Sequence, residues 1–232
     1  MPSAAPTPED PAPDAPGSSE PRSEGFPWIE TQGRLARLHA AHELTYDPEA
    51  RSFVAPSGRL RLPFAQAAFA SLDSPADCLD TLGDRLGLCV LVLVQAGATG
   101  LGLWRDDELL EHKTIKKYVV RGKGRAQPVH LKSKGKSRYG SRLRLQNAVR
   151  QLEETNEKLH EWVAKHGPFE RIFYSCPVRT WPELFRVTPP PPFSQRGDRT
   201  GPHRIPIEVR VPDFAEVKRV WRSLTRGREI RS

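Results

Sequence analysis

The most distinct feature of the hydrophobic pattern is an apolar run at residues 86–95, which reads Leu-Gly-Leu-Cys-Val-Leu-Val-Leu-Val-Gln. A continuous run of this length is typical of a central strand that is covered on both faces of a sheet. The segment 97–100 predicts a turn into a second strand at 101–104, and a third strand is expected at 109–120. The glycines of this turn lack the spacing of a phosphate-binding loop. The pattern therefore predicts a meander of three strands.

A change to helical spacing follows. Residues 141–166 are predicted to form a long helix, with Ser141 as its N-cap and Gly167 ending it. Its expected apolar stripe consists of Leu145, Val149, Leu152, Leu159, Trp162 and Val163. A fourth strand is predicted at 169–176, and a short helix capped by Thr180 at 180–185.

The last part of the chain predicts a strand and a closing helix. Residues 205–211 alternate between apolar and polar side chains, which indicates a fifth strand. Asp213-x-x-Glu216 matches a capping box. The inward residues of the helix that it opens are expected to be Phe214, Val217, Val220, Trp221 and Leu224. The order of elements predicts a mixed α/β (α+β) fold, with a mixed five-stranded sheet and helices packed on it.

The first part of the chain divides into a tail and a small subdomain. Residues 1–25 are rich in Pro, Ala and acidic side chains, which predicts a disordered tail. Residues 26–85 are expected to hold a helix at 31–44, a hairpin at 53–62 and a helix at 75–85 capped by Ser74. The remainder, 86–232, is expected to be the functional domain. The role of 26–85 is open.

Charge changes the picture most in the middle of the chain. The net charge is +8, and the stretch from His112 to Arg150 contains thirteen Lys and Arg residues but no Asp or Glu. Such a stretch repels itself unless a polyanion neutralises it, so an RNA partner is expected. The alternative is a solvated basic face that binds anionic surfaces loosely. The cations proposed to contact RNA are Lys113, Lys116, Lys117, Lys123, Arg125, Lys132, Lys134, Lys136, Arg138, Arg142 and Arg144.

A loop at 121–140 lies within this basic stretch. Gly122 and Gly124 end the preceding strand, and Gln127 is an uncharged amide among the cations. An amide does not titrate, but it can orient a water or hydroxyl and stabilise developing charge. We interpret the segment as a loop that is inserted into RNA with Gln127 as its working tip.

Other chemistry finds little support in the residue pattern. Cys78, Cys89 and Cys176 are odd in number and lack metal-ligand spacing, so buried unpaired thiols in a reducing cytoplasm are expected, with no metal and no cofactor. His39 and His42 lie one helical turn apart without a third ligand nearby, and are interpreted as ordinary helix residues. Ser133-x-x-Lys136 has no partner motifs. No apolar run is long enough to span a bilayer and no signal-peptide pattern is present, so no membrane partner is expected.

The basic stretch also resembles a known family. The matching segments are Lys113-Thr-Ile-Lys-Lys-Tyr-Val-Val-Arg121, Gly124-Arg-Ala-Gln127, Gly140-Ser-Arg-Leu-Arg144 with Asn147, Arg204-Ile-Pro-Ile, and Arg210-Val-Pro-Asp-Phe-Ala-Glu-Val-Lys-Arg-Val-Trp221. Over roughly 86–224 the chain resembles the release-factor-like tRNA hydrolases of ribosome quality control. The resemblance implies an RNase H-like mixed sheet, similar to the middle domain of eukaryotic-type class I release factors.

The resemblance also implies a function. Such proteins bind obstructed large ribosomal subunits and release the nascent chain by cutting peptidyl-tRNA with a G-x-x-Q loop. Carried onto this sequence, the catalytic residue is Gln127 and the loop glycine is Gly124, while Arg121 grips phosphate and Tyr118 braces the base of the loop. Tyr118 has an equal alternative as a core aromatic. Implied partners are the large subunit, its rRNA and peptidyl-tRNA.

Two points stay open within this resemblance. Arg125-Ala126 stands where ordinary release factors have Gly-Gly, so the bond that is cut is either the peptidyl ester or a phosphodiester at the tRNA 3′ end. The zinc-finger and ankyrin modules of eukaryotic members are absent from the sequence, which predicts a compact member of bacterial type. A monomer is expected. The alternative function is a non-catalytic binder of the ribosome or of structured RNA that uses the same basic loop.

Overall fold

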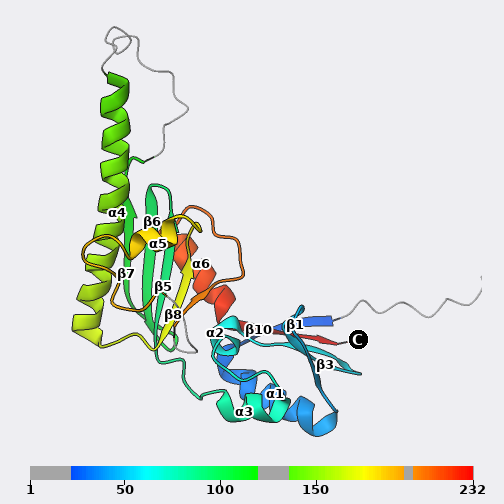
Figure 1. Ribbon diagram of the computed structural model, residues 1–232. Helices are drawn as coiled ribbons and strands as arrows, with labels where there is room; N and C mark the ends of the chain where they lie inside the picture. Colours follow the sequence, from blue (N-terminus) through cyan, green and yellow to red (C-terminus); the bar gives the residue numbers. More distant parts are fainter. Residues whose placement is uncertain (1–21, 120–135, 196–200, 232) are drawn as a thin grey trace, which may run out of the picture.

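The computed structural model contains two five-stranded sheets that lie at different ends of the molecule (Figure 1). It describes residues 22–119, 136–195 and 201–231, with only the backbone at Arg22 and at 136–141. The predicted mixed five-stranded sheet is present, but it is the second of the two. The first sheet has no counterpart in the expectation from sequence beyond one hairpin.

The first sheet is antiparallel throughout and has the order β1-β10-β4-β3-β2. Its strands are β1 (Arg22–Pro27), β2 (Thr45–Asp47), β3 (Ser52–Ala55), β4 (Gly58–Arg61) and β10 (Arg226–Arg231). One face packs on α1 (Thr31–Ala41) and α3 (Pro75–Thr81), with Leu35, Phe53 and Leu60 in a shared core. The short elements η1 (Trp28–Glu30) and α2 (Phe64–Ala67) complete this part of the chain.

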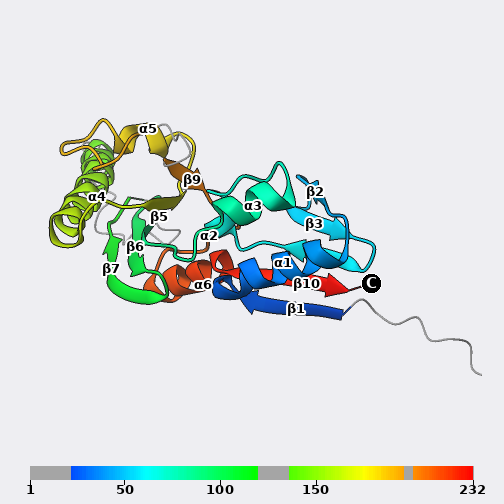
Figure 2. The same cartoon turned by 90° about the horizontal axis from the view of Figure 1, so that it is seen from below.

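The second sheet is mixed and has the order β7-β6-β5-β8-β9. The antiparallel strands β5 (Leu88–Gln95), β6 (Ala98–Arg105) and β7 (Glu108–Lys116) form the predicted meander, and β8 (Arg171–Ser175) and β9 (Pro202–Arg204) add parallel pairs. Helices α4 (Lys136–His166) and α5 (Thr180–Leu184) cover one face, and α6 (Phe214–Leu224) covers the other (Figure 2). β5 is therefore covered on both faces, as its apolar run predicts, and Val90 and Leu91 are fully buried.

Local signals place several elements correctly. Ser74 Oγ accepts a hydrogen bond from the Asp77 backbone N–H at the start of α3, and Asp213 Oδ1 accepts one from the Glu216 N–H at the start of α6. The capping box is only half formed, however, because the Glu216 carboxylate accepts from the Arg210 N–H instead of from Asp213. Thr180 is the first residue of α5, and no side chain caps that helix.

The prediction of a fifth strand at 205–211 is wrong. The fifth strand of this sheet is β9, three residues upstream, and its pairing with β8 closes with a bond from the Ile205 N–H to the Tyr174 carbonyl oxygen. Pro206 has no N–H to continue the ladder. Ile207 and Val209 still pack against the core, while Val211 is 61% exposed, so the alternation reflects partial burial without strand pairing.

The long helix also differs from the prediction at its start. α4 begins at Lys136, so Ser141 lies inside the helix and is not its cap. Leu152, Leu159 and Trp162 are buried as expected, but Leu145 and Val149 are 68% and 39% exposed. The reason is position, because the first turns of α4 extend beyond the edge of the sheet that the later turns cover (Figure 1).

The two ends of the chain meet in the first sheet. β10 lies between β1 and β4, so the expected division at residue 86 does not separate the two sheets. β1 begins at Arg22, within the segment predicted to be a disordered tail, and residues 1–21 lie outside the described part of the chain.

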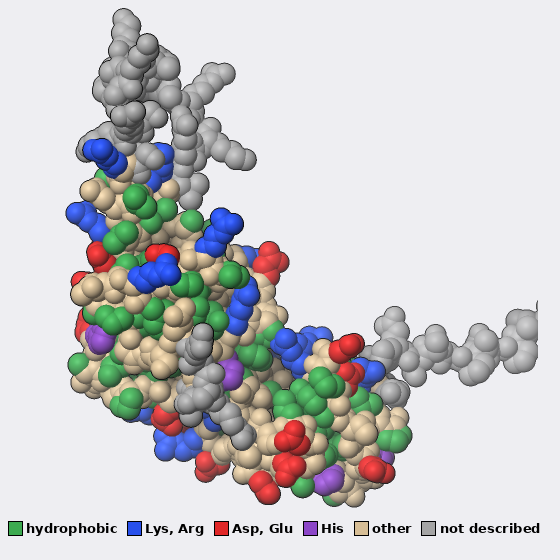
Figure 3. All heavy atoms as spheres, in the orientation of Figure 1, with side chains coloured by type: hydrophobic (Ala, Val, Ile, Leu, Met, Phe, Trp, Pro, Cys, Tyr) green, Lys and Arg blue, Asp and Glu red, His purple; other side chains and the backbone are tan. Residues whose placement is uncertain are grey.

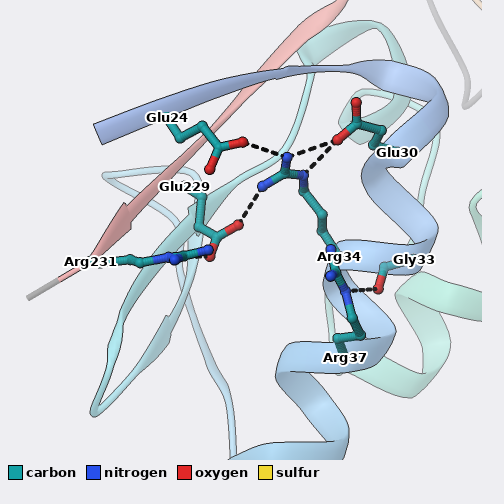
Figure 4. A network of polar contacts seen from close by, with 7 residues as sticks. All are labelled: Glu24, Glu30, Gly33, Arg34, Arg37, Glu229 and Arg231. Atoms are coloured by element: carbon teal, nitrogen blue, oxygen red, sulfur yellow. Dashed lines mark hydrogen bonds and ion pairs between the residues drawn. The ribbon is translucent and has the colours of Figure 1, made fainter. Parts of the chain in front are cut away.

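An arginine holds this junction together (Figure 4). Arg34 of α1 contacts Glu229 of β10 and Glu24 of β1, each at 2.7 Å, and also pairs with Glu30 at 2.8 Å. Its guanidinium lies 4.8 Å from the centre of the Phe26 ring. One side chain thus ties a helix to both terminal strands.

Candidate functional site

The predicted site residues divide into those that the structure describes and those that it does not. Outside the described ranges lie Arg121, Lys123, Gly124, Arg125, Gln127, Lys132 and Lys134. Lys136 and Arg138 belong to α4 by their backbone only. The described members are Lys113, Lys116, Lys117, Tyr118, Arg142 and Arg144, and they mark the two ends of the basic loop. The described residues therefore define the base of the loop.

The first end of the loop is fixed where β7 finishes. Lys113 and Lys116 are exposed on this strand. The backbone N–H of Lys117 donates to the Gly97 carbonyl oxygen at 2.9 Å, and its ammonium pairs with Glu154 of α4. Lys117 thus has an anionic partner within the protein, which its place in an acid-free stretch did not indicate.

Tyr118 is attached to α4 through its backbone. Tyr118 is 55% exposed, so the interpretation of Tyr118 as a core aromatic is wrong. Its carbonyl oxygen accepts a 2.9 Å hydrogen bond from the Nδ2 of Asn147 in α4. This contact joins the segment that leads into the loop to the helix that follows it, across 29 positions of sequence.

A buried amide fastens the turn beside this base. Gln151 of α4 is 3% exposed, and its Oε1 accepts from the Gly97 N–H at 3.0 Å. Its Nε2 donates to the Gln95 carbonyl oxygen at 2.8 Å and to Thr99 Oγ1 at 2.9 Å. Every polar atom of this side chain is engaged, which makes the contact between helix and turn geometrically specific.

Gly97 is required at this turn for two reasons. Its φ of +84° lies in the left-handed region, where a Cβ is strained. A Cβ here would also stand 2.7 Å from the Lys117 carbonyl oxygen. The glycine therefore permits the close approach of the β5–β6 turn to the residues that enter the loop.

The connection continues to the other face of the sheet. Gln95 Nε2 donates to the carbonyl oxygens of Val209 and Arg210 at 2.8 and 3.0 Å, and the Arg210 N–H donates to Glu216 of α6 at 2.7 Å. Two glutamines thus link α4, the β5–β6 turn and the segment before α6, and Glu216 joins that segment to α6. Sequence reasoning missed both, because an uncharged amide gives no pattern that reveals which groups it will bond in the fold.

Positive charge surrounds this end of the sheet. Arg142 is exposed and Arg144 is half-buried on the first described turns of α4. Lys and Arg side chains gather at the end of the molecule where the first described turns of α4 lie (Figure 3). A negatively charged ligand is therefore favoured at the loop base.

The described residues show no conventional catalytic set. All three cysteines are buried, and burial raises the pKa of the thiols of Cys78, Cys89 and Cys176 to about 12. No group of three or more His, Cys, Asp or Glu side chains that could hold a metal occurs in the part of the chain that is described. None of its helices is both long and apolar enough to cross a membrane.

Comparison with known proteins gives the family. No curated protein matches the chain. A solved structure named "Vms1 mitochondrial localization core" matches with 14% sequence identity and a TM-score of 0.46, over 87% of this chain and 81% of that one. The family described as "Bacteroidetes VLRF1 release factor" matches residues 89–231, well over half of the sequence. The resemblance to release-factor-like proteins of ribosome quality control is thereby confirmed, and the chain belongs to the Bacteroidetes VLRF1 release factor family.

Proposed function

We propose that this protein cleaves peptidyl-tRNA on obstructed large ribosomal subunits, with the Gly124-Arg-Ala-Gln127 segment as its catalytic loop. Membership of a release factor family supports nascent-chain release as the outcome. The structural observation that carries the proposal is the set of hydrogen bonds at the base of the loop. Asn147, Gln151 and Lys117 join the segment that enters the loop, the helix that follows it and the β5–β6 turn at one corner of the second sheet.

A fixed base is what a loop with a non-titrating catalytic residue needs. The amide of Gln127 works by position, because it orients a nucleophile and stabilises developing negative charge without exchanging a proton. The benefit of positioning depends on geometry to within about 1 Å. The cations of the loop and of α4 hold the phosphates of the tRNA end.

Two reactions fit this arrangement. Water attack on the ester carbonyl breaks the bond to the ribose and gives a free peptide acid and a tRNA with an intact 3′ end. Attack of a ribose 2′-hydroxyl on the neighbouring phosphodiester near the 3′ end forms a new P–O bond and leaves a 2′,3′-cyclic phosphate on the tRNA. The 5′-oxygen of the next nucleotide leaves and takes up a proton, and the peptide departs with the terminal nucleotides attached. The product RNA distinguishes them.

The test uses purified large subunits that carry a labelled nascent-chain–tRNA. The wild type is compared with Gln127→Ala and with Gln32→Ala. Gln32→Ala is the control, because Gln32 is an exposed glutamine on α1, which packs on the first sheet. We expect the wild type and Gln32→Ala to release peptide, and Gln127→Ala to be slower by at least about 10²-fold while still binding the subunit. The length of the tRNA product then identifies the bond that is cut.

The alternative of a non-catalytic binder predicts a different result. In that case the wild type binds the subunit and releases nothing, and Gln127→Ala behaves in the same way. Loss of both binding and release in Gln127→Ala would instead contradict a purely catalytic role for this residue.

A further inference from the structure

The face of the first sheet that α1 and α3 leave uncovered carries arginines. In β4, Leu60 is 1% exposed and points into the core, while Arg61 beside it is exposed. In β10, Gly227 is buried where a Cβ would stand 2.2 Å from the Phe26 ring, so Arg226 and Arg228 point to the opposite face. Alternation along both strands therefore places Arg61, Arg226 and Arg228 on one surface. Arg59 of β4 lies on the same face, but it is paired with Asp47 and does not line the pocket described below.

The register brings two of these charges directly opposite each other. Arg228 of β10 pairs with Arg61 of β4. Like charges directly opposite on neighbouring strands destabilise a sheet. The fold thus contains an arrangement that repels itself in the absence of an anion.

The same surface forms one wall of an open pocket of about 450 Å³ between the first sheet and the end of α6. Five exposed arginines line it: Arg51, Arg61, Arg222, Arg226 and Arg228. Phe64 and Ile207 add apolar surface. Among the described residues that line the pocket, none is Asp or Glu. Figure 3 shows Lys and Arg side chains gathered where the first sheet meets the rest of the molecule.

Neighbouring arginines outside the pocket have carboxylate partners. Arg34, Arg59 and Arg231 lie in or beside the same sheet, and each has a carboxylate partner at 3.4 Å or less. None of the five pocket arginines lies within 4.0 Å of a carboxylate in the described part of the chain. On the strands of this sheet, the described arginine side chains without a carboxylate partner are therefore those that line the pocket, Arg61, Arg226 and Arg228.

We infer that this arginine pocket binds phosphate groups of an RNA backbone, as a second RNA contact away from the basic loop. The guanidinium fork matches phosphate in a bidentate manner. A site for a small molecule encloses most of its ligand. Here all five arginines are exposed and come from three parts of the chain, which suits a polymer that lies across the surface. In Figure 1 the first sheet lies at the opposite end of the molecule from the first turns of α4, so the two contacts would engage separate parts of an RNA.

The test measures binding of fluorescein-labelled deacylated tRNA to the full chain by anisotropy, over a series of KCl concentrations. The pocket variant is Arg61→Gln with Arg228→Gln. The control is Arg59→Gln with Arg231→Gln, which removes the same charge from the same two strands at arginines that are paired and lie outside this pocket. The single variant Arg222→Gln removes a pocket charge from α6.

We expect the pocket variant to bind about tenfold more weakly and its salt dependence to fall by a slope of about 1 to 2. The control should change by less than about twofold, and Arg222→Gln should lie between them. The pocket variant should remain folded, because it removes a repulsive pair, and thermal unfolding checks this.

Two results would overturn the inference. Equal losses in the pocket and control variants would mean that only net charge matters, and unchanged tRNA binding in the pocket variant would exclude RNA as the ligand. If tRNA binding is unchanged, calorimetry with ADP tests for a different ligand. ADP binding that is lost in the pocket variant alone would assign the pocket to a free nucleotide. The inference does not depend on Gln127, because Gln127→Ala should slow release without changing the salt slope of tRNA binding.

Discussion

The side-chain amide of Asn147 donates a hydrogen bond of 2.9 Å to the carbonyl oxygen of Tyr118, and this contact closes the base of the basic loop. A loop whose ends are held together has fewer conformations than one whose ends move independently. The position of Gln127, nine residues beyond Tyr118, depends on where that base is fixed.

Replacing Asn147 therefore tests the link between the loop base and the proposed catalysis. Asn147→Ala should lower the rate of peptide release by about tenfold or more, because reacting groups lose alignment, while the free energy of unfolding falls by only about 1 kcal/mol. Release assays and urea unfolding measure the two effects separately.

Two further variants make this prediction specific. Gln146→Ala removes an exposed amide from the adjacent position and should leave release unchanged. Asn147→Asp keeps the size but places an anion against the Tyr118 carbonyl, so it should be at least as slow as Asn147→Ala. Full activity of Asn147→Ala would show that the base does not position the loop.

The second sheet could be predicted from sequence because its signals are local. The apolar run of β5, the helical spacing from Leu152 to Trp162 and the Asp213 cap each lie within a few turns or one strand of chain. These patterns report burial, and burial is what the structure confirms. A pattern that reports burial does not report hydrogen bonding. This explains the wrong prediction at 205–211, where burial alternates along the chain without strand pairing.

The first sheet could not be predicted because its information is long-range. β10 reads Arg-Gly-Arg-Glu-Ile-Arg, which has no apolar alternation, and its partner β1 lies at the other end of the chain. Arg34 and Glu229 are 195 positions apart. The amides of Gln95, Asn147 and Gln151 raise a similar difficulty, since only the fold reveals their partners. The roles of Gln127, Gly124 and Arg121 stay predictions.

The close packing of α6 on the second sheet leads to a prediction about β6. At Gly102 a Cβ would stand 2.3 Å from the Trp104 ring and 2.8 Å from Val217 Cγ1. Trp104 is 3% exposed and stacks on Trp221 with ring centres 4.4 Å apart, so it has no free space to move into. Gly102→Ala should therefore lower the free energy of unfolding by about 1 to 3 kcal/mol.

Gly33 provides the matched control for this substitution. It lies within α1, and a Cβ there would meet no heavy atom within 4 Å. Gly33→Ala should raise stability by about 0.5 to 1 kcal/mol through helix propensity and a less flexible unfolded chain. Urea unfolding of both variants checks the prediction, and a neutral Gly102→Ala would contradict the packing argument.

The last prediction concerns acid sensitivity at the start of α6. Glu216 is buried, and its carboxylate accepts bonds of 2.7 Å from the Arg219 guanidinium and from the Arg210 N–H. The Arg219 hydrogen bond, aided by that of Arg210, holds the pKa of Glu216 below its ordinary value of 4.5, although burial acts in the opposite direction. The unfolded carboxyl thus takes up a proton more readily than the folded one. Its contribution to stability is fully present above pH 4.5 and is lost as the pH falls through the lower, folded-state pKa.

Glu216→Gln should consequently be less stable than the wild type by about 1 to 2 kcal/mol at pH 7, because it loses a charge-assisted pair. The difference should shrink between pH 4.5 and pH 3, as the wild type loses the same charge. Glu157→Gln is the control, since Glu157 is exposed on α4 and has no ion-pair partner among the described residues. Urea unfolding at pH 7, 4.5 and 3 measures the three proteins side by side. A difference between Glu216→Gln and the wild type that stays constant over this range would mean that the ionised form of Glu216 does not stabilise the fold.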